Sequence, residues 1–433
     1  MSAVRTSSTF ESLTVPNFRL YFIGVTASNI GQWMARTASS WLVLMTLTDG
    51  NARALGWVVA LNFLPILLLA PVAGTFADPF SKRSVMNWCQ VVLALSALTL
   101  ATLVLTGRVE LWHVYALACL DGTAAAFDGP ARQSMVAELV PSRLLPNAIS
   151  LNSASFNMAR LVGPGVAGFL IAVVDTGPVL AVNAVMFLIL IACLLLIRAD
   201  QMHATRVKRG QGGIVQGVRY IRRRADLVVL LIVAFMMGNF GFNFAISNAV
   251  MATEAYGKGS GEYGMLGSWM GVGALTAALA SARRRPRVRY VLGALLAFSL
   301  LMIASAFSPN YALFAALQVP IGFFAITVLI TANALVQTSV TPEMRGRVMS
   351  VWGAALLGGT PFVSPVVGWM GDVLGPRWTI IGPILPVLLV FFLVTAWVMH
   401  HDHLSVVFDR SKKAPWLRLV RGRITEDMPH PVR

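Results

Sequence analysis

Two stretches of equal length, spaced about 200 residues apart, decide the fold, because self-similarity at a fixed distance indicates an internal repeat. They are NAISLNSASFNMARLVGPGVAG at 147–168 and RVMSVWGAALLGGTPFVSPVVG at 347–368. Each stretch leads from a polar start to an end that is rich in small residues and Pro. We therefore expect the chain to consist of two similar halves.

The composition around these stretches is that of a membrane protein. The 433 residues are 57% hydrophobic and only 12% charged, and the mean hydropathy is +0.71. A soluble domain carries about 25% charged residues, so the chain has too little charge to cover a water-soluble globule. This excludes a soluble enzyme, a disordered chain and a coiled coil, and the recurring apolar runs predict an all-α integral membrane protein.

Apolar runs interrupted by charged, Pro and Gly clusters predict twelve transmembrane helices. The two repeats fall on the fifth and the eleventh of these helices. The halves are therefore expected to be two pseudo-symmetric six-helix bundles, related by an axis along the membrane normal. The predicted spans are 18–47, 53–77, 84–105, 111–136, 147–173, 178–197, 227–252, 262–282, 288–307, 311–337, 346–371 and 377–399.

Basic residues are distributed very unevenly over the predicted loops. With a cytoplasmic N-terminus, the outer loops contain only Arg53, Arg108, Lys258 and Arg377, two more arginines lie within helices, and the other 28 of the 34 Lys and Arg residues face the cytoplasm. Because positively charged loops stay inside, both termini are predicted to be cytoplasmic. The same bias accounts for the net charge of +16 without a nucleic-acid partner.

The longest internal polar stretch separates the two halves. Within it, IVQGVRYIRRR at 214–224 has apolar residues at helical spacing, which favours an amphipathic helix on the anionic inner leaflet. A solvated linker is the alternative. The predicted organisation is a cytoplasmic N-terminal segment, a first bundle, a basic linker, a second bundle and a basic cytoplasmic tail, at 1–17, 18–197, 198–226, 227–399 and 400–433.

The loop after the second predicted helix carries a family motif. GTFADPFSKR at 74–83 matches the pattern G-x-x-x-D-R-x-G-[KR]-[KR] at Gly74, Asp78, Lys82 and Arg83. With this motif and twelve predicted helices, the chain resembles the Major Facilitator Superfamily. The resemblance implies transport by alternating access between the two bundles, with these four residues at a cytoplasmic gate.

The same resemblance suggests how the gate closes. An Asp at a helix end can accept hydrogen bonds from a neighbouring helix and pair with an arginine. The resemblance implies that Asp78 does this against the eleventh helix and Arg132, which would latch the outward-facing state. An Asp in an ordinary turn is the alternative. Asp128, four residues before Arg132, is expected to pair with it as a further gate element.

The fifth predicted helix contains Gly163, Pro164 and Gly168, which is similar to the G-P-x-x-G-G signature of the superfamily's antiporters. Pro164 removes one backbone donor and is expected to bend the helix, while the glycines let helices approach closely. The signature favours export. A packing seam with no bearing on direction is the alternative.

A narrower resemblance covers residues 17–400, nearly the whole chain. It rests on the stretches 120–141, 147–164 and 342–351, which resemble the enterobactin-exporter-like branch of the superfamily, known as transmembrane secretion effectors. This branch implies a multi-pass protein of the bacterial inner membrane.

Arg36, Asp121 and Arg160 lie deep within predicted helices. An ionised group at the membrane centre costs about 2.5–3.5 kcal/mol, so such groups line a cavity or have a partner. Asp121 and Arg160 are expected at similar depth, paired within a substrate and proton pathway; a structural pair is the alternative. The polar stripes on these helices and on those of the second half complete the predicted pathway with Asn29, Trp33, Asn157, Asn239, Asn243, Asn333 and Gln337.

Together these features predict a secondary transporter that exports a small organic molecule, such as a siderophore or a drug-like compound, driven by protons. Proton-coupled uptake of an organic anion is the runner-up, suggested by two arginines against one aspartate. An enzyme is not predicted, because neither H-E-x-x-H nor G-x-S-x-G occurs, and a signalling role would leave the buried charges unexplained. We expect no cofactor, no metal and no nucleic acid, but a monomer whose partners are its substrate, protons and anionic lipids.

Overall fold

The structure is a computed structural model that describes residues 10–77, 80–203, 214–282, 286–401, 404–408 and 417–421. Within these residues the chain is almost entirely helical, which confirms the predicted all-α class. The exception is a pair of short antiparallel strands, β1 (Leu404–Phe408) and β2 (Leu417–Arg421).

The first half consists of six long helices joined by short loops. Local signals set their starts: α1 begins at Pro16, where the missing N–H leaves no hydrogen bond unmade, and Ser81 caps α3 by accepting a hydrogen bond from the backbone N–H of Ser84 at 3.1 Å. The helices are α1 (Pro16–Trp41), α2 (Ala52–Ala77), α3 (Lys82–Leu105), α4 (Leu111–Leu139), α5 (Leu145–Val174) and α6 (Thr176–Leu196).

The second half differs from the first because two of its predicted spans are interrupted. The predicted seventh span is divided into α8 and α9 with π-helical segments at Met237–Gly241 and Met251–Ala255, and the predicted eleventh is divided at Gly358 and Gly359. The helices are α7 (Ile214–Arg222), α8 (Ala225–Met236), α9 (Phe244–Val250), α10 (Ser260–Ala282), α11 (Val288–Ala306), α12 (Tyr311–Ser339), α13 (Pro342–Leu357), α14 (Thr360–Leu374) and α15 (Trp378–His401).

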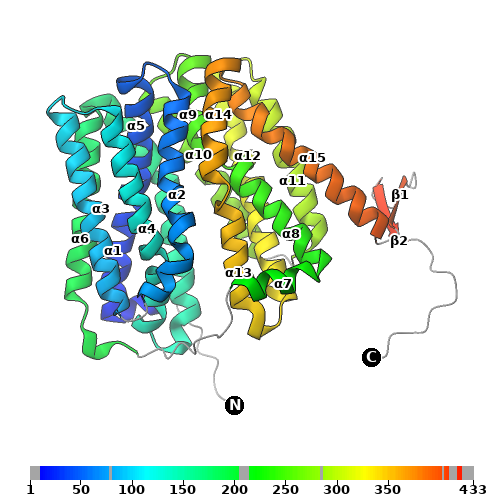
Figure 1. The fold of residues 1–433 in the computed structure, drawn as a ribbon, viewed down its shortest axis with the longest axis horizontal. Helices are drawn as coiled ribbons and strands as arrows, with labels where there is room; N and C mark the ends of the chain where they lie inside the picture. The colour runs from blue at the N-terminus through cyan, green and yellow to red at the C-terminus, as the bar shows by residue number, and fades with distance from the viewer. Residues whose placement is uncertain are drawn as a thin grey trace.

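Ten helical segments are long and apolar enough to cross a membrane, judged over the described residues. They coincide with ten of the twelve predicted spans. The other two predicted spans are α1 and α4, which are long but contain Arg36, Asp121, Asp128 and Arg132 and are therefore less apolar. For these two helices the membrane crossing stays a prediction, although both lie within the first bundle alongside the others (Figure 1).

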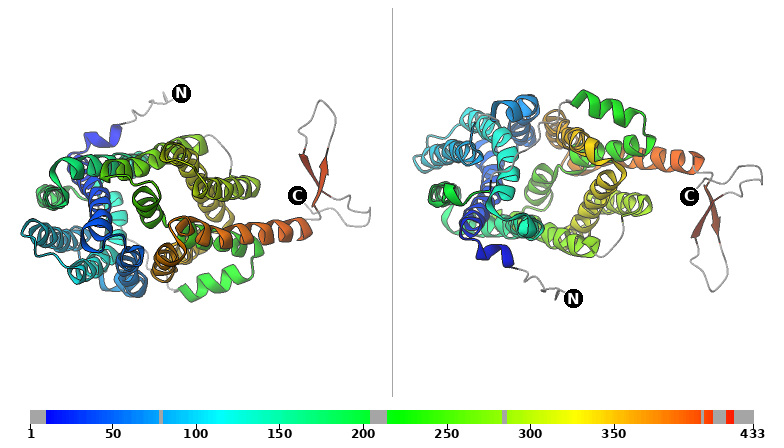
Figure 2. Two further views of the ribbon diagram at one scale, coloured as in Figure 1. Left: turned by 90° about the horizontal axis from the view of Figure 1, so that it is seen from above. Right: turned by 90° about the horizontal axis from the view of Figure 1, so that it is seen from below.

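Two bundles lie side by side, the first built from α1–α6 and the second from α8–α15 (Figures 1 and 2). We call the end of the molecule at which α7 lies the linker end, and the opposite end the far end. The short helix α7 packs on α13, where a Cβ added to Gly217 would come within 2.8 Å of the Arg347 carbonyl oxygen.

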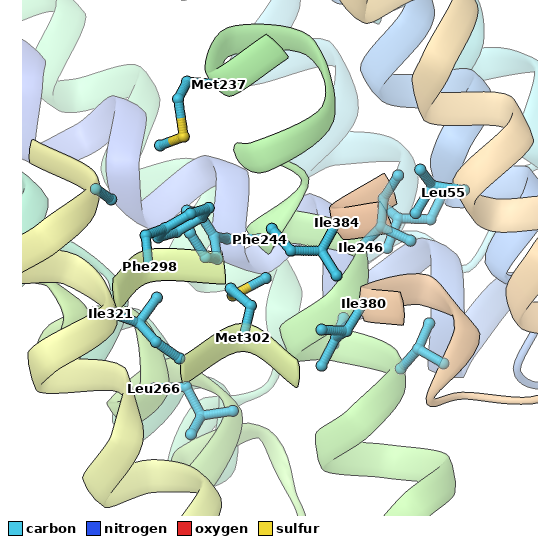
Figure 3. Close-up of a cluster of buried hydrophobic side chains, with 14 of the residues drawn as sticks. Leu55, Met237, Phe244, Ile246, Leu266, Phe298, Met302, Ile321, Ile380 and Ile384 are labelled. Carbon is cyan, nitrogen blue, oxygen red and sulfur yellow. The ribbon is translucent and has the colours of Figure 1, made fainter. Parts of the chain in front are cut away.

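The second bundle has a continuous apolar core between its helices (Figure 3). The rings of Phe244 and Phe298 meet edge to face, with centroids 6.4 Å apart, and Ile321, Ile380 and Ile384 are buried around them. This packing fixes α9 against α11, α12 and α15, so the broken seventh span is held firmly on one side.

Candidate functional site

The far end is closed by a contact between the two bundles. The carboxylate of Asp372, near the end of α14, accepts hydrogen bonds from the first two backbone N–H groups of α2, those of Ala52 at 2.7 Å and Arg53 at 3.1 Å. The same carboxylate lies 3.7 Å from the Arg53 guanidinium. Because a helix N-terminus favours negative charge, Asp372 fastens α14 to α2, and we call this contact the far-end latch.

A seam of small residues closes the other side of the far end, between α5 and α10. A Cβ on Gly267 would lie 2.8 Å from the Cβ of Pro164, and Gly168 lies directly against the backbone at Ser260. Towards α1, a Cβ on Gly163 would lie 2.6 Å from the Cβ of Trp33. Gly163, Pro164 and Gly168 thus form a close packing seam, while the predicted bend at Pro164 stays a prediction because α5 runs through it as one helix.

One stripe of α5 changes from exposed to buried along its length. Towards the linker end, Ile149 is 52% exposed and Phe156 is 46% exposed. Towards the far end, on the same stripe, Ala167 is fully buried and Ile171 is 6% exposed. The face of α5 that meets the other bundle is therefore sealed at the far end and accessible from the linker end, and Arg160 lies at the transition.

Arg36 and Trp33 of α1 lie at the same transition. The Arg36 side chain is exposed, and its guanidinium carbon lies 5.2 Å from the centre of the Trp33 ring. The Trp33 ring in turn meets Phe156 of α5 edge to face, with centroids 6.1 Å apart. Arg160 is partly exposed, but its Nε is buried and has no hydrogen-bond partner. We call these four residues the arginine–aromatic cluster.

The predicted ion pair between Asp121 and Arg160 is wrong. No ion pair within 4 Å joins them, and Asp121 instead accepts a hydrogen bond from Ser96 of α3, with its other oxygen buried and without a partner. The stripe of α4 that carries Asp121 and Asp128 contacts α3, inside the first bundle.

Asp128 and Arg132 of α4 form an ion pair of 2.8 Å on the same inward-facing stripe. Gln90 of α3 donates to the other Asp128 oxygen at 3.0 Å, and Arg132 also donates to Asn29 of α1 at 3.2 Å. Asn29 is 7% exposed. Its amide belongs here to a buried network that joins α1, α3 and α4, and its place in the substrate pathway stays a prediction.

Asn239 and Asn243 are likewise buried. The Asn239 oxygen accepts from the Gly359 N–H at 2.7 Å and from the Thr360 hydroxyl at 3.2 Å, and its nitrogen donates to the Ala355 carbonyl at 2.9 Å. Asn243 accepts from Ser364 at 3.2 Å. These amides bind the break in the seventh span to the break in the eleventh, and their role as pathway residues stays a prediction.

The remaining predicted pathway amides lie in the halves of α5 and α12 that are nearer the linker end. Gln337 is exposed near the linker end of α12 and donates to Asn333 at 2.5 Å. Asn157 of α5 is partly exposed and donates to the Ser153 carbonyl of its own helix at 2.8 Å. Each of the three amides forms a hydrogen bond within its own helix and remains accessible for further contacts.

The predicted cytoplasmic gate is only partly visible. Asp78 lies outside the described residues, and Gly74 lies in α2 where only the backbone is described. Lys82 is the first residue of α3, and Arg83 donates to the Leu195 carbonyl of α6 at 2.9 Å. Over the part of the chain that the structure describes, no three His, Cys, Asp or Glu side chains gather in a way that could hold a metal ion.

The family described as transmembrane secretion effector matches residues 7–415. This chain belongs to that family. The family and its relatives are transporters of the Major Facilitator type, so this transmembrane secretion effector is a transporter and not an enzyme.

Relatives of this secretion effector include transporters of different named substrates. It is 27% identical to the multidrug efflux pump Tap of Mycolicibacterium fortuitum over 387 residues, which is 86% of this chain and 93% of that one. It is also 24% identical to the staphyloferrin A transporter of Staphylococcus aureus, over 74% of this chain and 81% of that one.

Solved structures with low identity share its fold. The nucleoside transporter NupG matches with a TM-score of 0.67 at 14% identity, covering 88% of this chain and 98% of that one. A bacterial homologue of the human lysosomal transporter Spinster, inward-facing and unoccupied, matches with a TM-score of 0.68 at 12% identity, covering 88% and 96%. These likenesses concern the arrangement of helices alone.

The structure adds residues that sequence reasoning missed. Asp372 was not singled out, although an acidic residue near a helix end, between glycines, is a signal for a capping contact. Gln90 and Ser96 of α3 were also missed, because a lone amide or hydroxyl in an apolar helix does not reveal which neighbouring helix it faces.

Proposed function

We propose that this transporter is a proton-driven exporter of small organic molecules that works by alternating access in the bacterial inner membrane, with both termini in the cytoplasm and as a monomer. In this proposal the chain forms two six-helix bundles at 18–197 and 227–399, which the basic linker joins. The helix α7 and the basic loops contact anionic lipids. The observation that carries it is the stripe of α5 that is sealed at the far end and exposed at the linker end.

The distribution of charge gives this asymmetry a direction. Arg219, Arg222 and Arg223 lie at the end of α7, at the linker end, and positively charged loops remain in the cytoplasm. The linker end is then the cytoplasmic end, and the exposed inner faces of α5 and α12 are open to cytoplasmic substrate. An exporter must load its substrate from this side.

Export also requires the far end to open. The far-end latch between Asp372 and the start of α2 would have to separate, together with the seam between α5 and α10. The latch consists of one carboxylate, two backbone N–H groups and one arginine. It lies partly in solvent, so separating these groups costs little free energy during a transport cycle.

Protons have two candidate carriers in the first bundle. Asp121 and Asp128 both lie in the interior of that bundle, at positions where ionisable residues in membranes commonly serve proton relays. Asp121 is the better candidate, because one of its oxygens lacks a partner, whereas Asp128 is held by Arg132 and Gln90. Asp121 lies away from the cluster, so any coupling to substrate would pass through movement of α4.

Uptake of an organic anion is a second candidate function, favoured by two arginines without a carboxylate partner. Uptake would couple to protons if the anion displaced Asp121 from Arg160, but these two residues are not paired. Anion binding at Arg160 therefore needs no direct proton transfer to Asp121, which removes the physical reason for symport.

Inside-out membrane vesicles test the direction. We expect vesicles that contain the protein to accumulate a fluorescent compound that its expression helps cells to exclude, when the lumen is acidified. Accumulation should stop on addition of a protonophore, and addition of the compound should release protons from the lumen. The Asp121→Asn variant should retain binding and lose the proton release.

Vesicles without the protein provide the background, and the Arg108→Gln variant, changed in an exposed far-end loop, provides the matched control. Accumulation in right-side-out vesicles under an inward proton gradient, without accumulation in inside-out ones, would contradict export and establish uptake.

A further inference from the structure

The arginines of the arginine–aromatic cluster differ from Arg132 and Arg53, which pair with carboxylates. Arg132 has Asp128 at 2.8 Å and Arg53 has Asp372 at 3.7 Å. Arg36 and Arg160 form no ion pair with any carboxylate among the described side chains, and the buried Nε of Arg160 has no acceptor. Two positive charges therefore remain unneutralised at a site that is partly shielded from water.

Such charges are expensive within a membrane protein unless something compensates them. Arg36 receives only the face of Trp33, a weak partner for a full positive charge. A bound anion is the missing partner. Guanidinium groups prefer carboxylates, which they bind through two parallel hydrogen bonds.

The aromatic members of the cluster restrict the anion further. Trp33 lies between the two arginines: it is three residues before Arg36 on α1, and it packs against Gly163, three residues after Arg160 on α5. With a rise of 1.5 Å per residue, the two arginines are separated by about 9 Å along the helix axes. The exposed Phe156 ring meets Trp33 edge to face, so a flat group can pack against both rings between the charges.

The position of the cluster makes it accessible from one side only. On α1, Ser40 lies one turn towards the far end from Arg36; it is buried and hydrogen-bonded to Tyr263 of α10. On α5, the stripe that carries Phe156 and Arg160 is exposed only towards the linker end. The cluster thus lies where the exposed part of the α5 stripe ends and its buried part begins.

We propose that Arg36, Trp33, Phe156 and Arg160 form the substrate-binding site and that the exported substrate is an organic carboxylate carrying an aromatic ring. The proposal rests on the proposed export and names its substrate class. A cation would be repelled by both arginines, and a small inorganic anion would leave Trp33 and Phe156 without a partner. A membrane potential that is negative inside also favours outward movement of an anion.

Equilibrium binding to the purified transporter in lipid nanodiscs tests this with three probes. 2-Naphthoate has both ring and charge, 2-naphthamide keeps the ring without the charge, and cyclohexanecarboxylate keeps the charge without the aromatic ring. We expect 2-naphthoate to bind at least about tenfold more tightly than either of the others. One charge-assisted hydrogen bond is enough to produce a difference in affinity of this size.

Variants assign the two parts of the probe. Arg36→Gln and Arg160→Gln should each weaken 2-naphthoate binding about tenfold and leave 2-naphthamide unchanged. Trp33→Leu should weaken both naphthyl probes and leave cyclohexanecarboxylate unchanged. Arg36 is exposed, so its variant should fold normally, and Arg108→Gln is the matched control for removal of one positive charge.

Equal affinity for 2-naphthoate and 2-naphthamide would overturn the proposal, and so would arginine variants that weaken both probes alike. These binding measurements do not depend on direction. If vesicles export a neutral or cationic compound while 2-naphthoate fails to bind, the substrate class is wrong and export stands. If 2-naphthoate binds as expected but moves inwards, export is wrong and the binding site stands.

Discussion

The two bundles bury their polar residues in different ways. In the first bundle, Asp128, Arg132 and Asn29 form a charged network between three helices, with Asp121 beside it. In the second bundle, Asn239 and Asn243 are uncharged, and they bind the backbone where two helices are broken. The first bundle can therefore respond to a proton, whereas the second holds an irregular backbone together.

This difference teaches how one repeat can serve two purposes. Charged side chains inside a membrane usually have a function, because burying them is costly. Irregular backbone is tolerated where side chains form hydrogen bonds with the backbone groups that it leaves unpaired. The fifth span of the first bundle is a continuous helix, α5, although it contains Pro164, whereas the equivalent eleventh span is divided into α13 and α14. We infer that the first bundle senses the proton and that the second bends.

The largest expected effect comes from breaking the charged network. Asp128→Asn leaves the buried Arg132 without a counter-charge, and loss of one partner from a buried pair costs about 3 kcal/mol or more. We expect a clear fall in the thermal unfolding temperature of the purified transporter. The double variant Asp128→Asn with Arg132→Gln should recover much of the loss, because it removes the uncompensated charge. A single variant with the stability of the wild type would show that the network is not needed for the fold.

A smaller effect is expected when the amide bridge of the second bundle is removed. Asn239→Leu leaves the Gly359 N–H and the Ala355 carbonyl without their partner, at a cost of about 1–3 kcal/mol. Hydrogen exchange should increase at Gly359 and Thr360 while the first bundle is unaffected.

Asn333→Leu is the matched control for the amide bridge, since this amide bonds only to Gln337 of its own helix, and its cost should stay within about 0.5 kcal/mol. Equal costs for the two asparagine variants would contradict the bridge between the breaks.

The sequence predicted the fold class because it depends on the length and apolar character of the helices, which composition records directly. It also identified the small residues at Gly163 and Gly168, since close helix packing depends on residue size. It failed for Asp121, because depth follows from position in the span but the rotation of α4 depends on its neighbours. It did not reveal the partner of Asn239, because the break at Gly359 that supplies this partner is visible only once the eleventh span is folded.

The smallest expected effect concerns Asp121 and Arg160. Residues that share a partner show coupling energies of about 0.5–3 kcal/mol, whereas residues without contact give additive effects. Asp121 accepts a hydrogen bond from Ser96 of α3, whereas Arg160 belongs to the arginine–aromatic cluster. The stability changes of Asp121→Asn and Arg160→Gln should therefore add to within about 0.5 kcal/mol, measured by chemical unfolding of the two single variants and the double variant.

Additivity of Asp121 and Arg160 would separate proton and substrate sites within the first bundle, and it would require α4 to move if protons drive transport. Coupling of about 1 kcal/mol or more would instead mean that the two side chains meet in another conformation of the transport cycle. That result would restore displacement of Asp121 from Arg160 by an anionic substrate, in which protonation of Asp121 strengthens substrate binding and favours symport. The same unfolding measurements on the two single variants and the double variant, repeated with 2-naphthoate bound, distinguish the two cases further. An anion that occupies Arg160 should abolish any coupling that passes directly between the two side chains.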